Sequence, residues 1–76
     1  MEPIQIREVV CQDTRGIQHT VRVMQTLRFV GEDAAKSGKW IQTLHYIVDG
    51  QHTVEHNKAE PDVIVVPATD IVIRLP

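Results

Sequence analysis

Residues 40–56 read WIQTLHYIVDGQHTVEH and contain two runs of strand-forming residues joined at Asp49-Gly50. Asp-Gly between two such runs is a strong hairpin signal, because glycine adopts positive φ without a Cβ clash and aspartate tolerates the same conformation. The sequence therefore predicts an antiparallel ribbon folded at this turn. The remaining strands are expected to be partners added to this ribbon.

Two loop lengths are compatible with this turn. A two-residue loop, Asp49-Gly50, pairs Ile47 with His52, whereas a three-residue loop, 48–50, pairs Tyr46 with His52 and Leu44 with Val54. A slip of one residue moves every side chain of the second strand to the opposite face. The hydrophobic pattern favours the three-residue loop, because that loop places Val54 against Leu44.

The loop length also decides what three histidines can do. The two-residue loop brings His45, His52 and His56 to one face, about 7–8 Å apart on the diagonal, where imidazoles can converge on a metal ion. The three-residue loop separates His45 from the other two. The three histidines are the metal candidates of the chain, although their spacing matches no common zinc pattern.

Two further strands are predicted before the ribbon, at residues 4–11 and 17–30. Apolar residues recur at odd positions of the second run, which is the period of a strand with one buried face. The even positions of the first run, from Ile4 to Val10, carry its isoleucines, so we expect them to lie opposite odd positions of the second. Residues 13–16, with Asp first and Gly last, are predicted to form a four-residue loop between these two strands.

The segment 31–39 breaks this alternation. Its early acids, its alanines and Gly38 near its end predict either a short helix near 32–37 or a loop. Residues 63–66 and 71–75 are rich in β-branched residues, which predicts two strands covered on both sides, or on one side by a partner subunit. The predicted fold class is mainly β: an antiparallel meander of five or six strands, forming a small curled barrel or a twisted open sheet.

The chain has 76 residues, one cysteine and a net charge of -2. This length suits a single domain, 1–76, which hides only about 60% of the surface exposed by the unfolded chain. A lone cysteine excludes an internal disulfide, so we expect a homo-oligomer to supplement the core. The acidic start and the lack of a long apolar run predict a cytoplasmic protein with no membrane contact.

The leading functional prediction is a small non-catalytic module that binds a protein partner or a second copy of itself. Large apolar and aromatic side chains dominate interface energetics. The interface candidates on one face of the ribbon are Trp40, Leu44 and Tyr46. No cofactor and no enzymatic activity are predicted, because Cys11 and Ser37 lie in no nucleophile motif. Cys11 is expected to be an inert, half-buried thiol; the alternative is a reactive thiol whose pKa is lowered by Arg7 and His19.

A nucleic-acid-binding module is one alternative. Arg7, Arg22 and Arg28 are predicted to share the outer face of the first two strands, where such a stripe can contact phosphates. The net negative charge argues against a nucleic-acid partner. The second alternative is a metal-binding hairpin that uses His45, His52 and His56.

The chain also resembles a group of small bacterial β-rich proteins with no assigned function. The shared pattern is an early Cys-x-Asp-x-x-Gly, a Thr-Val strand, a Tyr-x-x-x-Gly hairpin with a downstream valine, and a last apolar strand interrupted near a threonine. Its counterparts here are Cys11, Asp13, Gly16, Thr20-Val21, Tyr46, Asp49-Gly50, Val54 and Thr69. Asp70 stands where these proteins often carry glycine. The resemblance implies a β fold and adds no chemistry.

Overall fold

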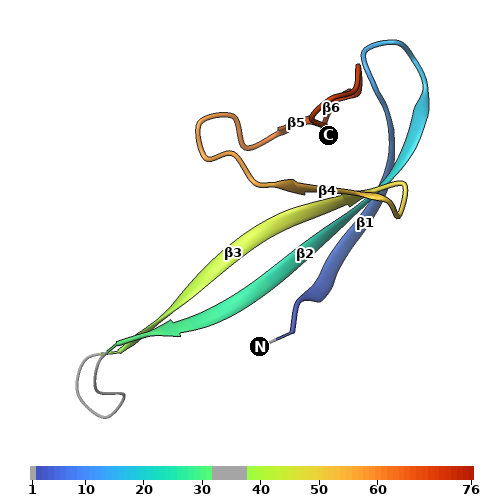
Figure 1. Ribbon diagram of the computed structural model, residues 1–76. Coiled ribbons are helices and arrows are strands. Elements are labelled where there is room, and N and C mark those ends of the chain that lie inside the picture. Colours follow the sequence, from blue (N-terminus) through green and yellow to red (C-terminus); the bar gives the residue numbers. More distant parts are fainter. Residues whose placement is uncertain (1, 32–37) are drawn as a thin grey trace.

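The computed structural model describes residues 2–31 and 38–76, and these residues form strands, turns and loops without any helix (Figure 1). The strands are β1 (Ile4–Gln12), β2 (Gln18–Val30), β3 (Lys39–Val48), β4 (His52–Glu55), β5 (Val63–Val65) and β6 (Val72–Arg74). The first four form one antiparallel sheet in chain order, and β5 and β6 form a separate hairpin.

The mainly β, antiparallel fold class is therefore confirmed. The prediction that all strands form a single meander is wrong, because they divide between two sheets. The larger sheet is open rather than closed into a barrel. The strands β1 and β4 are the edges of that open sheet. The prediction of a helix or a loop near 32–37 lies outside the described residues.

The β1–β2 turn is shorter than predicted and reverses the faces of β1. Asp13 and Ile17 are paired, with the Asp13 N–H donating to the Ile17 carbonyl at 2.8 Å, so three residues separate them. Gly16 in this loop has φ of 85°, a left-handed conformation that glycine adopts without strain. The predicted four-residue loop is wrong, and from Arg7 to Cys11 odd positions of β1 lie opposite odd positions of β2. A bulge between Gln5 and Arg7 shifts the register, so that Ile4 lies opposite Gln25 as predicted. Val9 consequently faces the core, whereas Val10 is exposed.

The β3–β4 connection comprises residues 49–51, so neither predicted pairing is right. Val48 lies opposite His52, and Tyr46 lies opposite Val54. Asp49 and Gly50 have φ of 55° and 70°, which identifies them as the centre of the tight turn. The predicted three-residue loop began one residue too early, which displaced its pairs by two residues but left each side chain on the correct face.

The core lies between the β5–β6 hairpin and one face of the large sheet, called here the inner face (Figure 1). Its buried side chains are Val21, Val23, Tyr46, Val48, Ile64, Val66 and Ile73. Ile64 and Ile73 lie opposite one another across the hairpin. Val65, on the far side of β5, is 53% exposed, so within this chain the hairpin is covered on one side only.

Replacing Ala68 by glycine is expected to stabilise the protein. Ala68 lies in the β5–β6 turn with φ of 61°, a left-handed conformation that costs a residue with a Cβ about 1 kcal/mol. Ala68→Gly should raise the free energy of unfolding by about 0.5–1 kcal/mol and the Tm by about 4 °C, measured by thermal and urea unfolding. Ala59→Gly, at a loop residue with negative φ, is the control, and an equal gain there would contradict the explanation.

Candidate functional site

A buried histidine joins the two turns at one end of the large sheet. His19 Nδ1 lies 2.6 Å from a carboxylate oxygen of Asp49, and Nε2 lies 2.8 Å from a carboxylate oxygen of Asp13. The pairing of Val21 with Val48 brings the start of β2 beside the end of β3, so the aspartates of both turns meet the same imidazole.

Both aspartates of this cluster also accept hydrogen bonds from other donors. Asp13 accepts hydrogen bonds from the backbone N–H groups of Arg15 and Ile17 at 2.8 and 3.1 Å, and from the Arg15 guanidinium at 2.9 Å. Asp49 accepts one from the backbone N–H of Thr20 at 3.0 Å. Both turns are therefore fixed by side-chain oxygens as well as by the sheet ladder.

These contacts shift the pKa of each member of the cluster. The hydrogen bonds to Asp49 and Asp13 raise the pKa of His19, and they outweigh its burial. Burial opposes ionisation of Asp13, but hydrogen bonds from His19, Arg15 and Ile17 hold its pKa well below the ordinary value. The hydrogen bond from His19 likewise lowers the pKa of Asp49. The cluster is thus an imidazolium that donates one N–H to each of two carboxylates.

The burial of this cluster indicates a structural role. Only 6% of the His19 surface and 6% of the Asp13 surface are exposed, which leaves a substrate no access to the imidazole. Sequence reasoning missed the cluster. A signal was present, since His19 occupies an inward, odd position of the clearest alternation and each hairpin turn contains an aspartate.

The two longest strands extend beyond the core as a two-stranded arm. The last pair between β1 and β2 is Ile4 with Gln25, and β4 covers β3 only from residue 45 onward. Residues 26–30 and 39–43, called here the distal ribbon, therefore pair with each other and with no further strand among the described residues (Figure 1).

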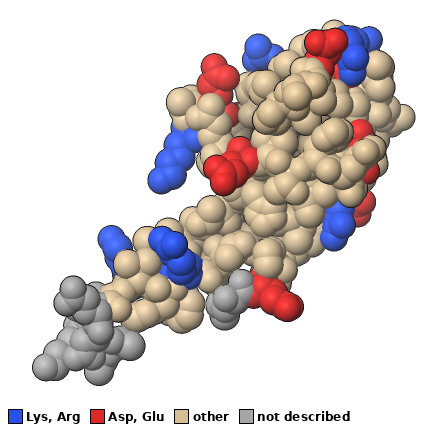
Figure 2. Space-filling model, viewed as in Figure 1, with Lys and Arg blue, Asp and Glu red and all other residues tan. Residues whose placement is uncertain are grey.

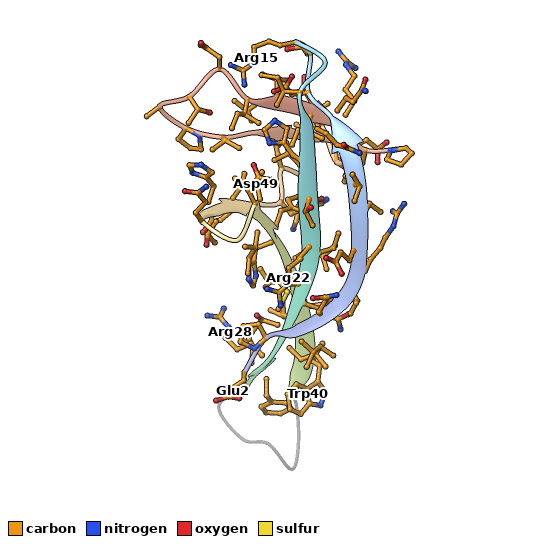
Figure 3. All side chains as sticks on the ribbon, turned by 90° about the vertical axis from the view of Figure 1, so that its right-hand side faces the viewer. Glu2, Arg15, Arg22, Arg28, Trp40 and Asp49 are labelled. Carbon is orange, nitrogen blue, oxygen red and sulfur yellow. The ribbon has the colours of Figure 1, made fainter. Side chains whose placement is uncertain are left out.

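Large apolar side chains are concentrated on the distal ribbon. They are Leu27, Phe29, Val30, Trp40 and Ile41. Trp40 is 59% exposed, and its ring meets the ring of Phe29 edge to face, with centroids 5.3 Å apart. Figure 3 shows Trp40 at the opposite end of the sheet from Asp49. The aromatic pair is therefore remote from the cluster around His19.

Gly38 determines how this aromatic pair sits. A Cβ built at Gly38 would lie 1.6 Å from the tip of the Phe29 ring, which packs directly over the glycine backbone. A side chain at this position would have to displace the ring. Because Gly38 has no Cβ, the Phe29 ring can pack against its backbone and remain beside Trp40.

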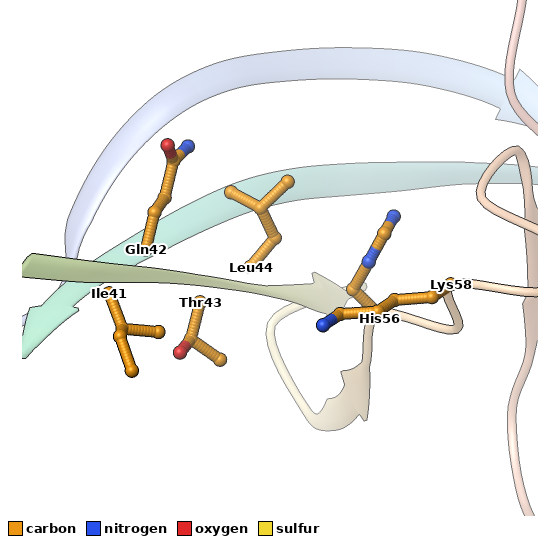
Figure 4. A pocket seen from close by; sticks show the side chains of 6 residues that line it. All are labelled: Ile41, Gln42, Thr43, Leu44, His56 and Lys58. Atoms are coloured by element: carbon orange, nitrogen blue, oxygen red, sulfur yellow. The ribbon is translucent and has the colours of Figure 1, made fainter.

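The edge of β3 within the distal ribbon borders a groove. The His56 N–H donates to the Leu44 carbonyl at 3.2 Å, and the chain then leaves the sheet. A groove of about 460 Å³ begins there. It is lined by Ile41, Gln42, Thr43, Leu44, His56 and Lys58 (Figure 4). Consecutive β3 residues point to alternate sides of the strand in Figure 4, so the groove follows the edge of β3 rather than one face.

The predicted interface residues have different surroundings. Trp40 is exposed on the distal ribbon, and Leu44 is half-buried beside the groove. Tyr46 belongs to the core, and its hydroxyl donates to the Pro61 carbonyl at 3.3 Å. Trp40 and Leu44 are thus accessible to a partner, whereas Tyr46 packs inside the domain.

The three predicted nucleic-acid residues do not share a face. The reversed faces of β1 place Arg7 opposite Val23 on the inner side, whereas Arg22 and Arg28 occupy outward, even positions of β2. Arg22 also donates to the Gln5 side chain at 2.7 Å. In Figure 2 the basic side chains are scattered among acidic and uncharged groups, and do not form a continuous stripe.

The β3–β4 register separates the histidines. His45 lies opposite Met24 on the outer face, while His52 and His56 lie on the inner face, where the His56 ring is 6.1 Å from that of Tyr46. Residues 2–31 and 38–76 contain no group of three His, Cys, Asp or Glu side chains arranged to hold a metal ion.

The single cysteine, Cys11, is half-buried in β1, as predicted. Burial raises the pKa of Cys11, and the positive charge of Arg7 offsets this only in part. The imidazole of His19 is engaged by Asp13 and Asp49 instead. Burial therefore outweighs the neighbouring charge, as expected of an inert, half-buried thiol.

Comparison of the chain with protein-family models, curated proteins and solved structures finds no match. Within its described part, the chain forms no helix long and apolar enough to cross a membrane. The distal ribbon combines an exposed tryptophan with an open strand edge.

Proposed function

We propose that this protein is a self-associating β module whose interface is the distal ribbon. The carrying observation is an exposed Trp40, paired with a half-buried Phe29, on a ribbon that has two strands within the described residues. An isolated two-stranded ribbon is marginally stable in water at best, and needs a third strand or a packing partner. A second molecule can supply both the strand and the cover for the aromatic pair.

The exposed surface of the chain supports this proposal. The accessible surface is 5552 Å², whereas a compact folded protein of this mass exposes about 4,700 Å². The excess of roughly 850 Å² is close to the ~800 Å² that one partner contributes to a standard protein interface. The radius of gyration, 14.9 Å against about 11 Å for a compact chain of this length, indicates the same elongation.

Sedimentation equilibrium tests the proposal. The apparent mass should rise from 8.6 kDa toward that of a dimer as the concentration increases from micromolar to millimolar. Trp40→Lys should weaken the association at least tenfold, the equivalent of about 1.4 kcal/mol, because a charge would replace the largest exposed apolar group.

Val65→Lys is the matched control. Val65 is exposed to nearly the same fraction as Trp40 but lies on the β5–β6 hairpin, away from the distal ribbon, so this variant should associate like the unchanged protein. A strictly monomeric protein at every concentration would contradict the proposal. If both variants weakened the association equally, the interface would not be centred on Trp40.

A further inference from the structure

The open edge of β3 carries backbone groups that no described strand satisfies. In an antiparallel sheet, the N–H and C=O groups of alternate residues point to the same neighbouring strand. The Leu44 carbonyl accepts from His56 on the β4 side, and the Asp49 N–H donates to Thr20 on the β2 side. The backbone groups of Trp40 and Gln42 therefore point away from β2, toward the edge that β4 leaves open.

Given the proposed function, on which this inference rests, we propose that a second copy of the chain adds its own β3 to this edge, antiparallel and related by a two-fold axis at Ile41. The two four-stranded sheets would then form one continuous sheet across the axis. Main-chain hydrogen bonds would supply the affinity, as in other cases of strand addition.

The length of the open edge determines this register. His56 occupies the edge at Leu44, so the free stretch is 39–43, with Ile41 at its centre. A two-fold axis at Ile41 places Trp40 opposite the partner's Gln42, and Gln42 opposite the partner's Trp40. All the outward N–H and C=O groups of these two residues would then be paired.

The side chains are compatible with the same arrangement. On the outer face, Ile41 would contact the partner's Ile41. Lys39 would lie opposite the partner's Thr43, so no like charges would face each other directly. On the inner face, Trp40 of each copy would cover the partner's Gln42, and both aromatic pairs would lie near the axis.

Self-complementarity favours a second copy over an unrelated protein. A two-fold interface requires the same patch to match itself, and the stretch 39–43 offers an equal number of free groups on either side of its centre. The excess exposed surface is also about the size that one subunit of a stable dimer covers.

Cysteine cross-linking tests this register in the full chain, with Cys11→Ser as the background. Ile41→Cys should cross-link to itself, because directly opposed residues of a non-hydrogen-bonded pair have Cα atoms about 4.5 Å apart, within the range of a disulfide. Lys39→Cys and Thr43→Cys should each remain uncross-linked alone. A mixture of the two should cross-link, because the two-fold axis opposes residue 39 of one copy to residue 43 of the other.

Sedimentation of the same variants under reducing conditions separates the possible failures. A concentration-dependent dimer with the stated cross-linking pattern supports the inference. A dimer in which Ile41→Cys does not cross-link, or in which Val10→Cys on the β1 edge cross-links instead, overturns the β3 edge pairing and leaves the proposed self-association standing. A monomer at all concentrations overturns both.

Discussion

The His19→Leu variant is expected to lose about 3 kcal/mol of unfolding free energy near pH 5.5, because breaking a buried ion pair leaves uncompensated charge inside the protein. Leucine retains most of the side-chain volume but removes both N–H donors. Two carboxylates would then approach one apolar group at the junction of the two turns. Urea unfolding followed by circular dichroism measures the loss.

The loss should depend on pH in a defined direction. The raised pKa of His19 means that its stabilisation is complete below the ordinary value of 6.5 and disappears as the pH rises through the raised value. The lowered pKa values of Asp13 and Asp49 mean that their stabilisation is complete above 3.8 and disappears as the pH falls. Unchanged protein should therefore be most stable between about pH 4 and 6.5.

The difference between the unchanged protein and His19→Leu should shrink at alkaline pH. A neutral imidazole has one N–H and can donate to only one of the two carboxylates, so the unchanged protein loses part of the same interaction. His45→Leu is the control, since His45 makes no ion pair in the described part of the chain. A difference that stays constant from acid to alkaline pH would contradict the assigned charge of His19.

Ile73→Ala is expected to cost about 3–4 kcal/mol, because it removes a large fully buried side chain and leaves a cavity. Ile73 is 0% exposed at the centre of the core, where it faces Ile64. A domain of this length has a total stability of roughly 4–11 kcal/mol. The variant should therefore be largely unfolded under mild denaturing conditions.

Thermal unfolding at neutral pH measures this effect. Val65→Ala is the control, because Val65 belongs to the same hairpin and is 53% exposed on its far side. It should change the free energy of unfolding by less than about 0.5 kcal/mol. Equal losses in the two variants would mean that the hairpin packs on the sheet differently.

Much of the fold could be predicted from local chemistry. The alternation of residues 17–30 identified the long strand β2, and Asp-Gly identified the turn between β3 and β4. The β-branched runs identified both strands of the final hairpin. These features are local because side-chain period and positive φ depend on adjacent residues only.

Strand register could not be read in the same way. The Asp13–Gly16 turn was recognised, but whether Asp13 itself is paired depends on a hydrogen bond to Ile17 outside the turn. Because Asp13 is paired, the side chains of β1 from Arg7 onward lie on the faces opposite to those predicted. This removes Arg7 from the predicted arginine stripe. The ion cluster required both registers to be correct, since Asp13 and Asp49 reach His19 from different hairpins.

The proposed interface was predicted in part. Trp40 and Leu44 were chosen for their size and lie on accessible surface, while Tyr46 of the same alternation is buried because the β5–β6 hairpin covers that end of the strand. The open edge of β3 was not predicted. Its position depends on the β3–β4 register, which places His56 opposite Leu44 and leaves the rest of the β3 edge open.

The contact between β6 and the first turn has a consequence for folding kinetics. Asp13 forms a bridge with Ile73, and the Thr14 N–H donates to the Val72 carbonyl at 3.0 Å, so the turn after β1 meets β6. The four-stranded sheet can form by successive short-range hairpins, but this contact requires closure of a loop of about 60 residues, from Asp13 to Ile73. Docking of the β5–β6 hairpin should therefore be a late step of folding, and during synthesis the core of the sheet can close only after β5 and β6 have been made.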